Sequence, residues 1–119
     1  WLNLLGEQNN KMESKKQTKY ARRIHGISRN QIFNFELHGK PGQYRYVDRK
    51  YKIAIILIGR KSTKYPTPKL SEIRRIYVDY GFKVLLIPFK DLDHPSRWDK
   101  VRVRILEAII SQLLKQINS

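Results

Sequence analysis

Residues 51–58 read YKIAIILI, and the apolar run from Ile53 to Ile58 has no polar interruption. Such a run is typical of a strand that is covered on both faces. A second apolar run spans Lys83 to Phe89, and between the two runs the apolar residues of Lys69 to Tyr80 recur at helical spacing. The order strand, helix, strand predicts a parallel pair joined by a right-handed crossover, with residues 51–58 as the central strand.

Upstream of the central strand, the sequence predicts an antiparallel hairpin. Apolar and polar residues alternate from Gln31 to His38, which is the period of a strand with one covered face. The Gly-Lys-Pro-Gly stretch at 39–42 supplies turn residues, and a second extended run follows from Tyr44 to Asp48. These two runs and the central strand are expected to form three antiparallel strands.

Two further helices are expected to flank the sheet. Lys11 to His25 is rich in helix-forming residues, is basic over most of its surface, and is followed by Gly26 as a C-terminal stop. From Asp99 to about Ile117, apolar residues recur at helical spacing. They form a broad stripe that must lie on the sheet or on a partner.

Together these elements predict a small three-layer α/β fold. Its mixed sheet of about four strands combines the antiparallel hairpin with a parallel β-α-β unit, between an N-terminal basic helix and a long C-terminal helix. With 119 residues the chain has the length of one domain, which we assign to residues 11–119 after an N-terminal extension at 1–10.

Composition narrows the class of protein. The chain has no cysteine, which excludes a disulfide scaffold and a Cys-ligated zinc module. The same absence is compatible with a reducing compartment such as the cytoplasm or an organelle matrix, and the localisation stays open. The longest apolar run is far below the roughly 20 residues of a spanning helix, so no membrane partner is expected.

The charge of the chain indicates a polyanionic partner. There are 25 Lys and Arg against 10 Asp and Glu, a formal net charge of +15. From Arg29 to Tyr65 there are nine bases and two acids, and a second basic concentration lies between Lys11 and Arg23. The expected partner is nucleic acid, contacted mainly by the first 65 residues.

The segment from Tyr44 to Lys52 interleaves aromatic rings with cations, so that a phosphate can be neutralised while a base stacks on a neighbouring ring. The same alternation also allows Tyr44 and Tyr46 to face the core and leave only the cations exposed. The expected nucleic-acid contacts are Lys15, Lys16, Lys19, Arg22, Arg23, Tyr44, Arg45, Tyr46, Arg49, Lys50, Lys52, Arg60, Lys61 and Lys64.

Three stretches share a pattern with a known group of proteins: Val47-Asp48, the strand ending at Gly59, and Gly81-Phe82-Lys83-Val84-Leu85-Leu86-Ile87. They resemble the restriction-endonuclease-like superfamily, in particular the very-short-patch-repair nucleases and the RAP domains of organellar RNA-associated proteins. The RAP-like resemblance implies RNA in preference to DNA, within a ribonucleoprotein assembly. The superfamily would place a first metal-binding acid at Asp48.

A nuclease is the alternative function. Hydrolysis with Mg²⁺ needs two or more carboxylates, but Ile56, Ile58 or Gly59 stands where the second acid is expected, and Glu36 on the neighbouring strand would have to replace it. We therefore expect a binding domain without cofactor or metal, with Mg²⁺ only if the protein is a nuclease.

Two other functions stay open. Tyr44-Arg45-Tyr46 and the stretch from Lys61 to Pro68 are similar to the mRNA interferases of the HigB and RelE type. That resemblance implies metal-free RNA cleavage, with Arg45 and Lys61 stabilising phosphate charge. A protein–protein module is the third class, and it would require the apolar stripe of the last helix to stay exposed.

Overall fold

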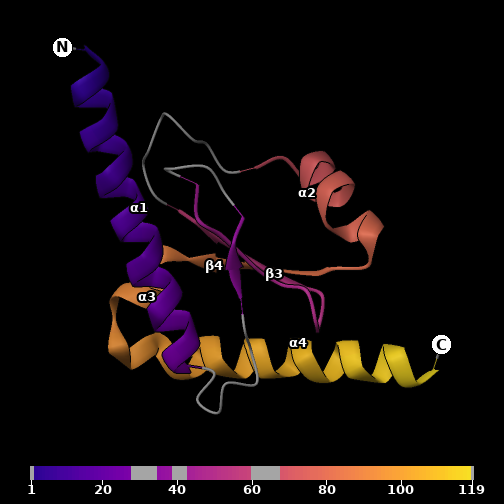
Figure 1. The fold of residues 1–119 in the computed structure, drawn as a ribbon. Coiled ribbons are helices and arrows are strands. Elements are labelled where there is room, and N and C mark those ends of the chain that lie inside the picture. Colours follow the sequence, from indigo (N-terminus) through magenta and orange to yellow (C-terminus); the bar gives the residue numbers. More distant parts are fainter. Residues whose placement is uncertain (1, 28–34, 39–42, 60–67, 119) are drawn as a thin grey trace.

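A four-stranded mixed sheet forms the centre of the computed structural model, which describes residues 2–27, 35–38, 43–59 and 68–118 (Figure 1). The strands lie in chain order and are β1 (Glu36–Leu37), β2 (Arg45–Asp48), β3 (Ile53–Ile58) and β4 (Lys83–Pro88). The pairs β1–β2 and β2–β3 are antiparallel, and β3–β4 is parallel. The predicted α/β fold with its antiparallel hairpin and parallel unit is confirmed.

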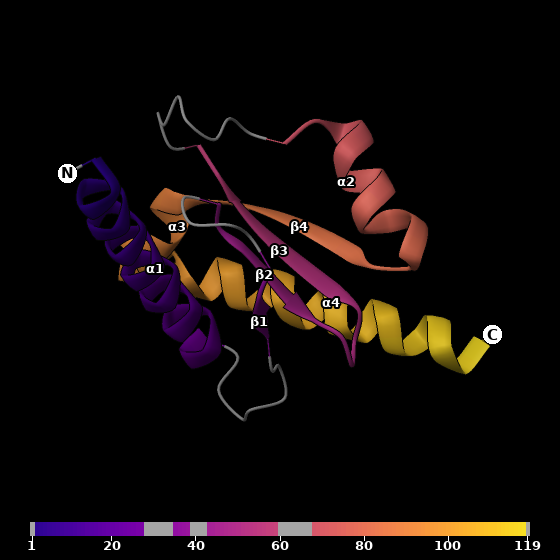
Figure 2. The same cartoon turned by 45° about the horizontal axis from the view of Figure 1, so that its top comes forward.

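Helices cover both faces of the sheet (Figures 1 and 2). They are α1 (Leu2–Ile27), α2 (Leu70–Ile76), α3 (Phe89–Asp93) and α4 (Trp98–Asn118), with short 3-10 turns at Val78–Tyr80 and Pro95–Arg97. Helices α1, α3 and α4 pack on one face, and α2 packs on the other. In the described part of the chain, no helix is long and apolar enough to cross a membrane.

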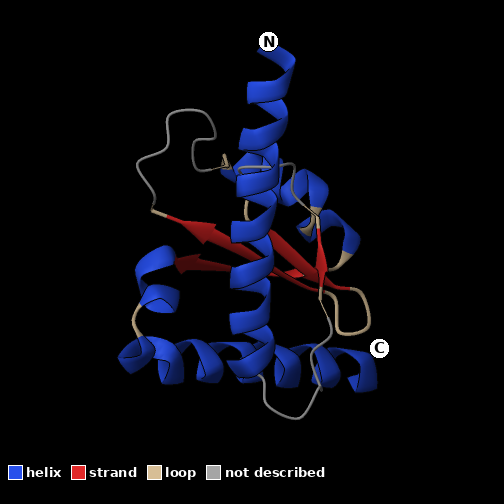
Figure 3. Ribbon diagram, turned by 60° about the vertical axis from the view of Figure 1, so that its left-hand side comes forward, coloured by secondary structure: helices blue, strands red, loops and turns tan. Residues whose placement is uncertain are grey.

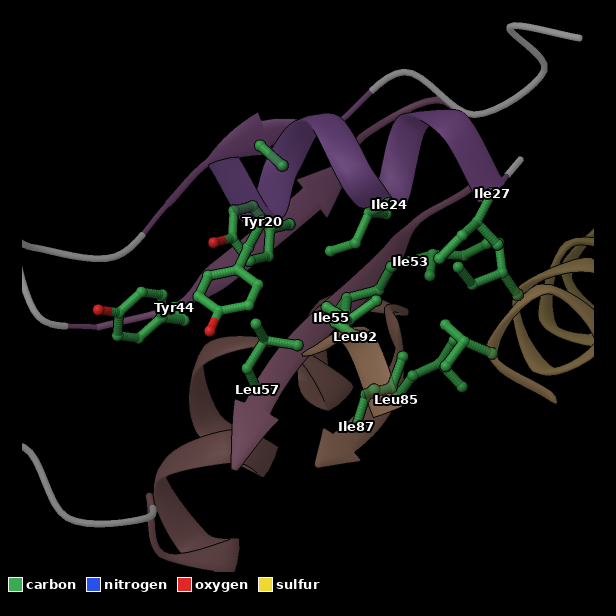
Figure 4. Close-up of a cluster of buried hydrophobic side chains, with 14 of the residues drawn as sticks. Tyr20, Ile24, Ile27, Tyr44, Ile53, Ile55, Leu57, Leu85, Ile87 and Leu92 are labelled. Carbon is green, nitrogen blue, oxygen red and sulfur yellow. The ribbon is translucent and has the colours of Figure 1, made fainter. Parts of the chain in front are cut away.

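Strand β3 is the central strand, as its sequence predicts. Its side chains alternate between two hydrophobic clusters because successive residues of a strand point to opposite faces. Ile53, Ile55 and Leu57 enter the larger cluster under α1, α3 and α4, part of which Figure 4 shows. Ala54 and Ile56 enter the smaller cluster under α2. An apolar residue at every position is therefore what a strand between two covering layers requires.

Helix α1 differs from its prediction at both ends. It is continuous from Leu2, so the residues assigned to an extension are helical, and it includes Gly26 rather than stopping there. The buried Tyr20, Ala21 and Ile24 dock it on the sheet, and its C-terminal part meets α4 (Figure 3). Of the predicted strand from Gln31 to His38, residues 31–34 lie outside the described part of the chain, as does the turn at 39–42.

The predicted helix from Lys69 to Tyr80 is two elements. Helix α2 ends at Ile76, and a 3-10 turn follows it. Gly81 ends this turn in the left-handed conformation (φ 86°). This change of winding breaks the expected apolar stripe. Ile73 and Tyr77 are buried, whereas Leu70 and Tyr80 are 79% and 70% exposed.

Helix α4 has the predicted length, but only part of its predicted apolar stripe is buried. Val101, Ile105, Ala108 and Ile109 pack in the larger cluster. The Gln112 side chain then donates hydrogen bonds to the carbonyl oxygens of Lys52 (2.7 Å) and Gly81 (3.0 Å), which precede β3 and β4. The sheet ends at this level, and the last turns of α4 continue past it (Figures 1 and 2). Leu113 and Ile117, which belong to the predicted stripe, are consequently exposed.

Candidate nucleic-acid interface

The outward side of α1 carries the most regular group of exposed cations. Residues 14–27 contain five Lys and Arg side chains and no acid. Three of them, Lys15, Lys19 and Arg22, are exposed, and we call these three residues the α1 basic face. Their spacing of four and three residues places them on one side of the helix over about 10 Å. Lys16, at its border, is half-buried.

Helix α1 is oriented by contacts on its opposite side. The Tyr20 hydroxyl donates a hydrogen bond of 2.9 Å to the Asp93 carboxylate, and Gln17 bonds to the backbone of Gln43. Arg23 donates to the Leu92 carbonyl oxygen and pairs with Asp93, both at 3.1 Å. Arg23 therefore anchors α1 to α3, and we assign it this structural role rather than the predicted phosphate contact.

The predicted stacking rings belong to the core. Tyr46 is fully buried, and its hydroxyl donates to the Gln17 carbonyl oxygen at 3.0 Å. Burial raises the pKa of Tyr46 far above its ordinary value. Tyr44 is also buried and makes edge contacts with Tyr20 and Phe89 (Figure 4). Both rings lie on the face of β2 that α1 covers, so base stacking on them is excluded in this fold.

Arg45 points to the other face of the sheet, toward α2. Its guanidinium is 3.0 Å from the Glu72 carboxylate, and its side chain is only 11% exposed. Desolvation lowers the pKa of Arg45, but hydrogen bonds to Glu72 and Tyr77 outweigh this effect and leave the pKa raised. The Tyr77 hydroxyl also lies 2.7 Å from His38 Nδ1 in a hydrogen bond. The predicted catalytic or phosphate-binding arginine is thus held in a polar network between β2 and α2.

The remaining predicted cations of the described chain lie in the β2–β3 turn. Arg49 is 3.4 Å from Glu36 in an exposed ion pair, and Lys50 lies over the Tyr51 ring. Lys52 has a left-handed backbone (φ 54°). This turn is at the end of the sheet next to Gln112, whereas α1 contacts the start of β2 at the opposite end. Arg60, Lys61 and Lys64 lie outside the described residues.

The predicted cations therefore do not form one continuous group in the described part of the chain. One group is the α1 basic face, and the other is the turn of Arg49, Lys50 and Lys52. Sequence reasoning missed Glu72, Tyr77 and His38, the partners of the Arg45 network. Glu72 is 27 residues from Arg45 along the chain, so only the folded arrangement reveals that pairing.

The candidate metal site is not assembled by Asp48 and Glu36. Asp48 is buried, and its Oδ1 accepts a hydrogen bond of 3.0 Å from the backbone N–H of Tyr51, which helps to close the turn. Glu36 pairs with Val47 across β1 and β2. Paired residues share a face of the sheet, and neighbours along a strand lie on opposite faces, so Glu36 and Asp48 are on different faces. Among the residues whose side chains the structure describes, 15–27, 35–38, 43–59 and 68–118, there is no group of three His, Asp or Glu that could hold a metal ion.

Comparison with known proteins adds no relative. No family model matches the chain, and neither the curated proteins nor the solved structures yield a match. The main indication of function is therefore the α1 basic face itself.

Proposed function

We propose that this domain binds nucleic acid, RNA in preference to DNA, by contacting the phosphate backbone with the α1 basic face. The observation that carries the proposal is the acid-free stretch 14–27, which presents Lys15, Lys19 and Arg22 on one exposed side of a helix. The preference for RNA rests on the RAP-like resemblance, which also favours a ribonucleoprotein assembly as the setting. The α1 cations provide phosphate contacts and no base-reading geometry, so binding depends on backbone and shape.

The salt dependence of binding tests this role. Single-stranded RNA, duplex RNA and duplex DNA are titrated over a salt series with the wild type and with the triple variant Lys15→Ala, Lys19→Ala, Arg22→Ala. Loss of three phosphate contacts lowers the slope of log affinity against log salt by about 2 on a single strand. Affinity at low salt falls at least about tenfold.

A matched control separates specific contacts from net charge. The variant Arg49→Ala, Lys50→Ala, Lys52→Ala removes the same charge from the other end of the sheet, and it is expected to keep most of the wild-type affinity and slope. Equal losses of affinity and salt slope in the two triple variants would mean that the protein attracts nucleic acid only through its overall charge. No binding by the wild type at low salt would overturn the proposal outright.

The alternative function is a nuclease, either Mg²⁺-dependent through Asp48 or metal-free through Arg45 and Lys61. Asp48 and Arg45 both have partners within the fold, and that favours binding without cleavage. Each titration mixture is therefore also incubated with and without Mg²⁺. Intact substrate in every tube supports the binding role. Mg²⁺-dependent cleavage that Asp48→Asn abolishes would replace the proposal, since Asn keeps the oxygen that accepts the Tyr51 hydrogen bond.

A further inference from the structure

Helix α4 has a second apolar face, which the sheet does not cover. Ile110, Leu114 and Ile117 are 57%, 54% and 77% exposed, and Val103 continues the row toward the start of the helix. Their separations of seven, four and three residues keep them on one side of α4. Apolar groups at helical spacing on an exposed face mark a contact surface for another helix. This face is distinct from most of the predicted stripe, whose residues Val101, Ile105, Ala108 and Ile109 are buried in the larger cluster.

A shallow hollow runs along this face. Its lining comes entirely from α4 and consists of Glu107, Ile110, Ser111, Leu114, Lys115 and Asn118. Ser111, the smallest of these side chains, lies near the middle, with Ile110 and Leu114 beside it. Glu107 precedes Ser111 by four residues, and Lys115 follows it by four. The hollow therefore has an acid and a base at equal distances from a small central residue.

We propose that this hollow binds the same face of a second copy of the chain, with the two α4 helices antiparallel and crossing near Ser111. A two-fold interface brings the same patch of both copies together, so the patch must be complementary to itself. In the antiparallel arrangement, Glu107 of each copy meets Lys115 of the other. A parallel pair would instead bring Glu107 to Glu107 and Lys115 to Lys115. The charges favour the antiparallel dimer.

The apolar side chains supply the packing of this dimer. Around the crossing point, Ile110 and Leu114 of each copy flank Ser111 of the other, and the small serine allows the helix backbones to approach. Two crossing helices bury less area than a standard protein–protein interface, so the dimer is expected to be reversible. The interface lies on α4 alone and involves none of the residues of the α1 basic face. Dimer formation therefore does not require nucleic acid and does not occupy the α1 basic face.

Sedimentation velocity on the wild type without nucleic acid tests the dimer. The weight-average mass is expected to rise from monomer toward dimer as the protein concentration rises to about 100 µM, within the range of small reversible interfaces. Ile110→Asp, Leu114→Asp and the double variant should remain monomeric at that concentration. Leu70→Asp is the matched control, because Leu70 is also exposed, at 79%, but lies on α2, and this variant should dimerise as the wild type does. A monomeric wild type, or dimers that survive the Ile110 and Leu114 substitutions, would overturn the proposal.

Charge exchange tests the antiparallel geometry. Glu107→Lys and Lys115→Glu each place like charges against one another and should weaken self-association at least about fivefold. The double variant restores opposite charges and should recover the wild-type dimer. A mixture of the two single variants should form a heterodimer, because each of its two contacts then joins an acidic and a basic side chain. Unchanged self-association of the single variants, or a mixture that stays monomeric, would exclude this arrangement.

Discussion

Helix α1 carries Tyr20 among basic residues, and strand β2 carries Tyr46 beside Arg45, but the fold uses the two elements differently. The strand lies inside the sheet between two covered faces, and each of its side chains enters one of the two packed layers. The helix lies on the outside, with Tyr20, Ala21 and Ile24 inward and Lys15, Lys19 and Arg22 outward. A segment with basic and aromatic residues therefore offers a binding surface only where the layer that carries it has a side facing solvent.

The largest expected change in stability comes from removing the aromatic ring of Tyr46 in β2. Tyr46→Ala deletes a fully buried side chain and its hydrogen bond to Gln17, so the free energy of unfolding should fall by about 3–5 kcal/mol. Lys19→Ala on α1 should change it by less than about 0.5 kcal/mol. Urea denaturation of both variants measures the difference. If Tyr46→Ala lowered the free energy of unfolding as little as Lys19→Ala does, Tyr46 would not be a core residue.

The buried phenol of Tyr46 also predicts an alkaline destabilisation. Its pKa is raised by burial in the folded state, so its stabilising effect is complete below the unfolded tyrosine pKa of about 10 and is lost as the pH rises above it. The free energy of unfolding should therefore fall above about pH 10, with a contribution from Tyr46 of up to about 1.4 kcal/mol per pH unit. Tyr46→Phe should lose this contribution. Parallel pH profiles of the two proteins would contradict the assignment.

A smaller effect is expected from the Arg45–Glu72 pair. Glu72 is more than a third exposed, so solvent screening limits the coupling energy to about 0.5–1 kcal/mol. A double-mutant cycle of Arg45→Ala and Glu72→Ala, followed by urea denaturation, measures it. Arg45→Ala should also leave the salt slope of RNA binding unchanged, in contrast to the α1 substitutions. A lowered slope would make Arg45 a phosphate contact after all.

The smallest effect concerns the β2–β3 turn. Lys52 has a positive φ, which glycine adopts without strain. Lys52→Gly should therefore stabilise the protein slightly, by about 0.5 kcal/mol, because relief of strain exceeds the added freedom of the unfolded chain. Thermal unfolding measures this gain. Loss of stability would indicate that packing of the Lys52 side chain near Gly81 matters more than its backbone conformation.

The strands could be predicted from the sequence because each is marked by a hydrophobic pattern within a few consecutive residues. The unbroken apolar run of β3 and the second apolar run at β4 predicted a parallel pair in which β3 is the inner strand. The long apolar repeat of α4 predicted the length of that helix. The break between Ile76 and Val78 was not predictable from periodicity, since the apolar spacing continues across it. The extent of α1 was also missed, because its first residues include Gly6 and three asparagines, which are weak helix formers.

The candidate interface could be predicted only in part. The sequence predicted that five cations, at Lys15, Lys16, Lys19, Arg22 and Arg23, cover the part of the helix outside its apolar side. The structure exposes three of them, Lys15, Lys19 and Arg22. Strand alternation placed Tyr44 and Tyr46 together but did not determine whether a helix covers their face. The acids that hold Arg23 and Arg45 are Asp93 and Glu72, which are distant in sequence and become partners only through the fold.

The two hydrogen bonds of the Gln112 amide have a consequence for assemblies on RNA. These bonds join α4 to the backbone just before β3 and just before β4. The exposed end of α4 is therefore held at a fixed angle to the sheet. A dimer formed through α4 would then be rigid and would carry two α1 basic faces at a fixed separation. An RNA long enough to contact both basic faces would bind the dimer with avidity. An RNA too short to reach the second face would bind the dimer with the same affinity as the monomer.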